Sequence, residues 1–582
     1  MPVPQRRCYI VVSLLAVLVI VGVACGQPPT KSEIAGSSHP VPGGRLIATS
    51  RTPPSTFNRL TTARTAEELV SRLTQGRLVR YNRVTKQVEP WLAREWAISP
   101  NGLVWTLTLR SDVTFSDGVP FTSGDVLFTF QSLYDPKVKA VGIDSFLFGR
   151  KPLKASAPDP QTVVLEFPEP YGGGIGLLDA LPIFPRHRLE AALVAGRFRD
   201  AWGLATPLAD IVGLGPFVVR DYVPGERLVF ARNDRYWRRD ETGAALPYLA
   251  ELELQFVPDA NAESLRLQSG EVDVVTDFVR PDDLATFRRL ASEGRVQLAD
   301  AGVSVSPDFL VFNLVPGAKP AQGRPWLQAL EFRQALAAAV DRQFLINNLY
   351  FGSAVPISGP ITSGYGDWYV PTLPRIDYDP VLARALLESA GLKDRTGDGL
   401  LDDMSGKTVR FSILTQKSTM QERAATMVQN QLRQVGLTVE VAPLEQQDML
   451  ARYGAGDYDV FLFFWRPTAL DPALNLDFWL SSGGFHLWNP NQTRPGTSWE
   501  AEIDAEMRRV ASTMDPAARR RAFETAQRTL AAHLPVVYFV APNNIVPMSA
   551  RVRGAAPSVL PAPVLWNAEQ LYLADPATRP PR

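Results

Sequence analysis

The sequence predicts an α/β protein, and three observations lead to this prediction. After residue 325, segments with apolar residues at helical spacing alternate with short apolar strands. Before that point the chain is richer in strand-like segments, so helices and strands together should build layered sheets. The chain of 582 residues is 45% hydrophobic and 21% charged. That composition can bury a large core and excludes a disordered chain.

Strands are predicted first in the earlier part of the chain. In residues 103–109, Leu and Trp side chains occupy one face while Thr106 and Thr108 occupy the other, which is the period of a half-buried strand. The other strands predicted in this part are Thr162–Phe167, Arg227–Arg232 and Glu251–Phe256.

Helices become clear in the later part. One helix is predicted from Phe332 through Phe344, ending by Gly352. Helices should also begin at Asp379-Pro380 and Asp515-Pro516, because Asp accepts free N–H groups and Pro suits the first helical position. A further helix is predicted to begin with a capping box of Thr419 and Glu422, and strands are predicted at 437–444, 458–465 and 536–540.

The N-terminus has the pattern of a secretory signal. Arg6 and Arg7 precede an apolar run at 9–24, whose 16 residues are fewer than the about 20 that span a bilayer as a helix. The run ends at Cys25 after small residues, as in a bacterial lipobox, although Gly22 stands where Leu is usual. We expect lipidation of Cys25 and a flexible tether to residue 44, which would hold the protein outside the cytoplasm on a membrane. An uncleaved anchor and ordinary signal cleavage are the alternatives.

Charge and motifs exclude several functions. With 60 basic and 60 acidic residues the net charge is zero, which argues against nucleic-acid binding. The chain has no nucleophile elbow, phosphate loop, C-x-x-C or zinc-protease motif, so we expect neither catalysis nor a cofactor. Converging carboxylates of a hydrolase cannot be seen by motif and remain an alternative. Asp394, Thr396 and Asp398 are weak calcium candidates, but Ser405 replaces the bidentate Glu, which favours a polar turn.

Seven segments resemble one family. The chain is similar to the extracytoplasmic solute-binding proteins of the peptide/nickel class of ABC importers, in the family's order over most of residues 45–545. The matching segments are Glu89–Trp96, Asn101–Arg110, Val113–Val126, Gly213–Phe217, Asn233–Trp237, Leu267–Val274 and Phe332–Arg342.

The resemblance implies a periplasmic-binding-protein-like clamp of two lobes, with an extra domain inserted in the first lobe. Closing the lobes around a small solute, such as a peptide, would present it to the permease and ATPase subunits of the importer. A monomer is expected. The boundaries implied by the family are 45–75, 205–315 and 529–582 for the first lobe, 76–204 for the extra domain and 316–528 for the second lobe.

The resemblance also implies a ligand site after the strand at 458–465. Peptide-binding members have a Trp at the strand end and, three residues later, an Asp that pairs with the peptide amine. Trp465 and Asp471-Pro472 match, but Thr468 occupies the position of that Asp. A neutral hydroxyl compensates poorly for a desolvated ammonium.

Four residues are therefore candidate ligand contacts. They are Trp465 for stacking, Arg466 for an anionic group, Thr468 for a hydrogen bond and Asp471, for which helix capping is the favoured alternative. The predicted function is capture of a peptide-like or other small solute. An oligosaccharide, an opine or a chelated metal are alternative cargoes, and a secreted hydrolase or a sensory or adhesive lipoprotein are alternatives of other classes.

Overall fold

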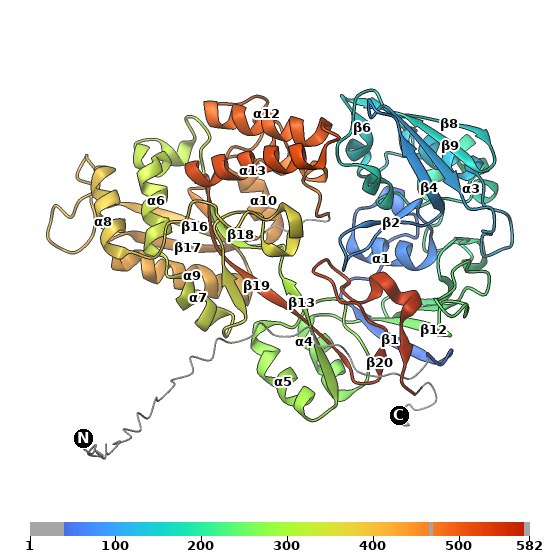
Figure 1. The fold of residues 1–582 in the computed structure, drawn as a ribbon. Coiled ribbons are helices and arrows are strands. Elements are labelled where there is room, and N and C mark those ends of the chain that lie inside the picture. Colours follow the sequence, from blue (N-terminus) through green and yellow to red (C-terminus); the bar gives the residue numbers. More distant parts are fainter. Residues whose placement is uncertain (1–39, 465–468, 576–582) are drawn as a thin grey trace, which may run out of the picture. The chain divides into compact units, whose positions relative to one another are not determined.

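The computed structural model describes residues 40–464 and 469–575 (Figure 1). The predicted signal sequence, Cys25 and the tether up to residue 39 lie outside the described residues. Within those two described ranges, no helix combines the length and the apolar character that crossing a membrane requires.

Two four-stranded sheets belong to the earlier part of the chain. One has the order β1-β12-β11-β10, in which only β1 and β12 are parallel. The other is antiparallel with the order β4-β5-β9-β8. All four strands predicted in this part are confirmed, to within one residue at their ends. The two sheets consist of β1 (Arg45–Ser50), β12 (Glu251–Phe256), β11 (Arg227–Arg232), β10 (Phe217–Val223), β4 (Ala93–Ile98), β5 (Val104–Leu109), β9 (Thr162–Glu166) and β8 (Lys154–Asp159).

A seven-stranded sheet contains the later strands. Its order is β13-β19-β14-β18-β16-β17, and β15 pairs with β19 beside this path. The strands are β13 (Val296–Val303), β14 (Asp308–Phe312), β15 (Ala354–Pro356), β16 (Arg410–Gln416), β17 (Thr438–Leu444), β18 (Val460–Phe464) and β19 (Val536–Ser549). Three two-stranded sheets contain the short strands β2 (Val79–Tyr81), β3 (Val88–Pro90), β6 (Leu147–Phe148), β7 (Lys151–Pro152), β20 (Val552–Arg553) and β21 (Tyr572–Leu573).

Strand β19 is longer than predicted and changes partners along its length. Its first half pairs with β14 and β15, and the residues from Asn543 to Ser549 pair with β13. Pro542, Asn543 and Asn544 interrupt the apolar pattern, which is why the sequence suggested an end at residue 540. In Figure 1 the strand runs from the seven-stranded region toward β1 and β12.

The helix predicted from Phe332 through Phe344 is two helices. The first ends at Ala339, and the second begins after Asp341, whose carboxylate accepts the N–H of Phe344 at 3.0 Å. Asp at this position competes with the helical pattern for backbone hydrogen bonds and so divides the segment. Phe344 is consequently 44% exposed rather than part of the core.

The other helix starts are close to prediction. Asp379 and Asp515 each accept two N–H groups of the helix that follows. The predicted capping box at Thr419 is wrong by one residue, because Ser418 is the cap and accepts from Gln421 N at 3.3 Å. The helices are α1 (Thr65–Thr74), α2 (Ser123–Tyr134), α3 (Arg186–Val194), α4 (Ala260–Ser269), α5 (Leu284–Ser292), α6 (Leu330–Ala339), α7 (Arg342–Leu349), α8 (Pro380–Ser389), α9 (Thr419–Gln434), α10 (Gln446–Gly454), α11 (Leu476–Trp479), α12 (Ser498–Ser512) and α13 (Pro516–His533).

Two large apolar cores lie on opposite faces of the seven-stranded sheet. Alternate residues of β14 enter each of them: Phe309 and Val311 belong to one, Leu310 and Phe312 to the other. The first core continues through both four-stranded sheets, whereas the second is closed by α6, α7, α8 and α9. Both faces of this sheet are therefore covered, which leaves the strand ends as the place for polar groups.

Buried ion pairs connect the C-terminal segment to the first strands. Arg551 donates to Asp273 at 2.6 and 2.7 Å, and Asp273 also accepts the N–H of Ile47 in β1. Arg80 contacts Glu569, which Arg238 also contacts at 2.6 Å. Each carboxylate is less than 5% exposed but faces arginine, so its desolvation is compensated.

Gly213 and Gly215 are required by close backbone approach. A Cβ at Gly213 would lie 1.9 Å from the carbonyl oxygen of Thr74, and one at Gly215 would lie 2.5 Å from that of Leu73. No flexible side chain can yield there, because the neighbours are backbone atoms.

We predict that Gly213→Ala lowers the free energy of unfolding by about 1–3 kcal/mol, since the added methyl must displace the end of α1. Urea denaturation followed by circular dichroism measures the change. Gly454→Ala is the matched control, because its Cβ meets nothing within 4 Å. It should leave stability equal or slightly higher, and equal stability of both variants would contradict the account.

Candidate binding site

A cavity of about 530 Å³ lies where β19 changes partners. Volumes of this size are typical of small-molecule sites. One wall comes from the segment after β1 and from residues 277–284, and the other from the ends of β14, β16 and β18 and the start of α9. The lining residues used below are Arg51, Asp277, Arg280, Asp282, Asp308, Tyr350, Gln416, Ser418, Gln421, Phe464 and Asn543.

The first wall carries charges that are paired within it. Arg51 contacts Asp277 and lies 3.4 Å from Glu263. Arg280 contacts Asp283 at 2.6 Å. These arginines are thus held by neighbouring carboxylates of the same wall, which leaves little excess positive charge on that side.

The second wall contains a buried carboxylate. Asp308, the first residue of β14, is 7% exposed, and Tyr350 Oη donates a hydrogen bond to it. No ion pair of Asp308 is found in the described parts of the chain. Burial raises the pKa of Asp308 to about 6, and the hydrogen bond from Tyr350 only partly opposes this. At neutral pH the group is mainly ionised and costs stability, and protonation removes that cost as the pH falls through about 6.

The two walls are joined at the rim by an exposed ion pair. Arg423 in α9 contacts Asp282 at 2.9 Å, with side chains 34% and 55% exposed. The start of α9, Ser418 to Gln421, lies beside this contact and lines the cavity. A pair this exposed contributes little energy, so the walls can separate at low cost in this contact.

The structure describes one of the four predicted ligand contacts. Trp465, Arg466 and Thr468 lie outside the described residues, although β18 leads to them and its last residue, Phe464, lines the cavity. Asp471 is described. Its carboxylate accepts from Ala473 N at 2.8 Å and forms an ion pair with Arg519 at 2.7 Å. These are the contacts of a capping and structural residue, and Asp471 does not line the cavity in the part of the chain described.

The calcium candidates form a turn. Asp394 accepts from the N–H groups of Gly397 and Gly399, and Asp398 accepts from Leu400 N. Among the residues described, no cluster of three or more His, Cys, Asp or Glu side chains is placed to hold a metal ion. These backbone contacts fit the polar turn that the sequence favours over calcium binding.

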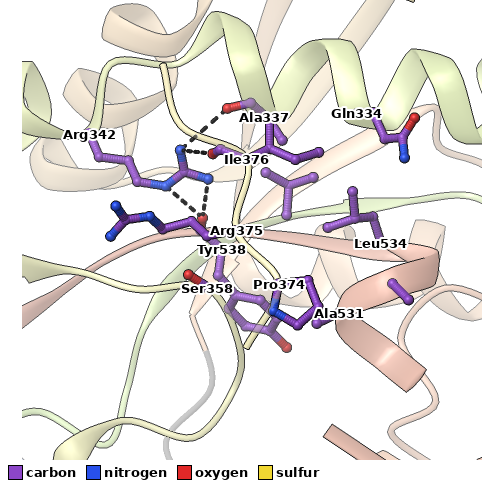
Figure 2. Close-up of a pocket in the computed structure, with 12 residues that line it drawn as sticks. Gln334, Ala337, Arg342, Ser358, Pro374, Arg375, Ile376, Ala531, Leu534 and Tyr538 are labelled. Carbon is purple, nitrogen blue, oxygen red and sulfur yellow. Dashed lines mark hydrogen bonds between the residues drawn. The ribbon is translucent and has the colours of Figure 1, made fainter. Parts of the chain in front are cut away.

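A second cavity, of about 250 Å³, lies between α6, residues 374–376 and the end of α13 (Figure 2). Arg342 lines it, and its guanidinium donates to the backbone oxygens of Ala337, Ile376 and Tyr538. This arginine is therefore occupied in connecting three segments, and the first cavity is the better candidate for a ligand.

Sequence reasoning missed Asp308 and Tyr350. The two residues are 42 positions apart and belong to no motif. One signal was present: Asp308 begins a strand in which every following residue is apolar and buried. An acidic side chain at the start of such a strand is expected at a sheet edge, near solvent or a site.

The chain belongs to the bacterial extracellular solute-binding proteins, family 5, whose family model matches residues 87–486. It is 26% identical over 395 residues to a probable ABC transporter-binding protein of Deinococcus radiodurans, covering 66% of each chain. It is 24% identical to the oligopeptide-binding protein AppA of Bacillus subtilis, covering 98% of this chain and 99% of AppA.

A solved structure gives the same fold. The substrate-binding protein CtaP of Listeria monocytogenes matches with a TM-score of 0.75 and 23% identity, over 92% of this chain and 100% of that one. The predicted fold class, a two-lobed α/β clamp, is thereby confirmed. The predicted lobe boundaries stay a prediction.

We predict that Asp471→Asn lowers the free energy of unfolding by about 1.5–3 kcal/mol, because buried Arg519 loses its charged partner. Thermal and urea denaturation measure this. The control Asp367→Asn alters an ion pair at 3.6 Å whose carboxylate is 83% exposed, so its effect should stay near zero. An Asp471→Asn protein as stable as wild type would contradict the structural role.

Proposed function

We propose that this protein is the receptor of an ABC importer and captures a small solute in the 530 Å³ cavity, then releases it unaltered to a membrane permease. The observation that carries the proposal is the position of the cavity. Its walls come from segments on both sides of the point where β19 changes partners. A solute held there contacts both walls, and binding then favours the closed state by its differential affinity.

The location on the membrane is part of the same proposal. The secretory pattern of the first 24 residues and Cys25 support export and lipid anchoring at the outer face of the cell membrane or in the periplasm. A receptor tethered in this way would act as a monomer. Catalysis is not part of the proposal, since the family consists of solute-binding proteins.

Two features bear on the class of cargo, and they point in different directions. A peptide is supported by the relative AppA, an oligopeptide-binding protein matched over nearly its full length. Thr468 argues against a peptide bound through its free amine in the manner that the family resemblance implies, because no carboxylate stands at that position. Non-peptide cargo, such as an oligosaccharide, an opine or a chelated metal, is therefore the second candidate.

The direct test is calorimetry of the purified protein with peptides, oligosaccharides and opines, combined with small-angle scattering. We expect at least one solute to bind at micromolar concentration and to reduce the radius of gyration, because closure brings the walls together. A bound solute recovered unchanged by mass spectrometry would support delivery. Failure of every solute, or turnover of one, would contradict the proposal.

The position of Thr468 gives a second prediction. Thr468→Asp should increase affinity for peptides with a free N-terminal amine, since it restores the carboxylate that peptide-binding members use. Thr415→Asp is unsuitable as a control because Thr415 is buried. The control is instead the same peptide with an acetylated amine, for which affinity should not increase. Equal gains for both peptides would show that residue 468 does not face the amine.

A further inference from the structure

We propose that Asp308 and Tyr350 form a cation-binding subsite in the cavity wall, which takes an ammonium or guanidinium group of the cargo. This inference rests on the proposed function, since it assumes that the cavity is the solute site. It assigns the cationic contact to the start of β14, which is a different element from the segment after β18.

Asp308 lacks a counter-charge in the described part of the chain. A carboxylate removed from water requires a cationic or strongly hydrogen-bonding partner. Three other acidic side chains of similar burial face arginines: Asp273 faces Arg551, Asp459 faces Arg324 and Glu569 faces Arg80. Asp308 has only a neutral hydroxyl beside it among the described residues. A cation supplied from outside the chain would complete the site.

The groups around the Asp308 carboxylate suit a cation. Phe464 stands opposite Asp308 in the β14–β18 register and lines the same cavity. Gln421, also in the lining, has a buried Oε1 without a hydrogen-bond partner among the described residues. An aromatic ring attracts cations, and an ammonium or guanidinium has several N–H donors for free acceptors. An anion at this position would be repelled by the ionised Asp308.

The arginines beside the cavity that the structure describes are already paired. Arg51 and Arg280 are paired with carboxylates of the first wall, and Arg423 is paired with Asp282 at the rim. A small closing movement that kept these pairs would leave Asp308 without a cation from the described part of the chain. The low exposure of Asp308, 7%, fits the tip of an amine or guanidinium rather than a bulky group.

A purely structural role is the competing explanation. The hydrogen bond from Tyr350 connects the end of α7 to the start of β14. In that case Asp308→Asn should be neutral or destabilising, and added cations should have no specific effect. A binding role predicts that added organic cations stabilise wild type specifically. It also predicts that Asp308→Asn without cations is more stable than wild type, because Asn still accepts from Tyr350 but removes the uncompensated charge.

The experiment compares wild type, Asp308→Asn and Asp367→Asn at pH 7.5. Asp367 is the matched control, since its exposed carboxylate lies outside the cavity lining described above and its change alters the net charge equally. Each protein is melted with butylammonium chloride, butylguanidinium chloride, 1-butanol or potassium chloride at equal concentration. Calorimetry measures the affinity of the two cations.

We expect Asp308→Asn without additives to melt higher than wild type. The two organic cations should raise the melting temperature of wild type and of Asp367→Asn more than potassium chloride or 1-butanol does, but not that of Asp308→Asn. The affinity loss in Asp308→Asn should be about 30-fold or more.

Equal cation responses of wild type and Asp308→Asn, or no specific response in wild type, would overturn the inference. Either result would leave the receptor function standing if a solute of the wider panel still closes the lobes. Failure of that whole panel with the cation response intact would instead contradict the receptor function.

Discussion

The partner change within β19 is the constraint on which the structure depends. One continuous backbone pairs with β14 in its first half and with β13 in its second. Two groups of segments therefore share this strand, and the cavity lies at its middle, beside Asn543. If the two walls move relative to each other, β19 and the neighbouring connections must bend. This is the usual arrangement of a hinge between packed units.

The acidic side chains that connect parts of the fold have arginine partners, whereas Asp308, in the cavity wall, has none among the described residues. Arginines compensate the buried carboxylates Asp273 and Glu569 and the half-buried Asp471, which connect segments far apart in the chain. Such pairs are costly to break, because either partner would remain as a buried charge. Asp308 has no such partner in the described chain, and it lines the cavity. Under the proposal, an arginine completes the carboxylates that stabilise the fold, whereas the cargo would complete Asp308.

Much of the fold could be predicted from the sequence, and the reasons are local. Asp before Pro identified the starts of α8 and α13, and alternation identified β5 and β12. Asp341 was missed because the apolar pattern continues across it. The site was harder, since Asp308 and Tyr350 meet only through tertiary packing and neither belongs to a motif. Asp471 was predicted as a cap or a ligand contact, and its ion pair with Arg519 could not be anticipated from spacing.

The central claim is that the cavity between the walls holds a solute that the protein does not alter. The most direct measurement is a crystal structure of the protein purified with its retained cargo, together with the mass of the released molecule. The account predicts continuous density in the cavity beside Phe464 and Asp308, and a released mass equal to that of the solute supplied. Density confined to another surface, or a released reaction product, would contradict it.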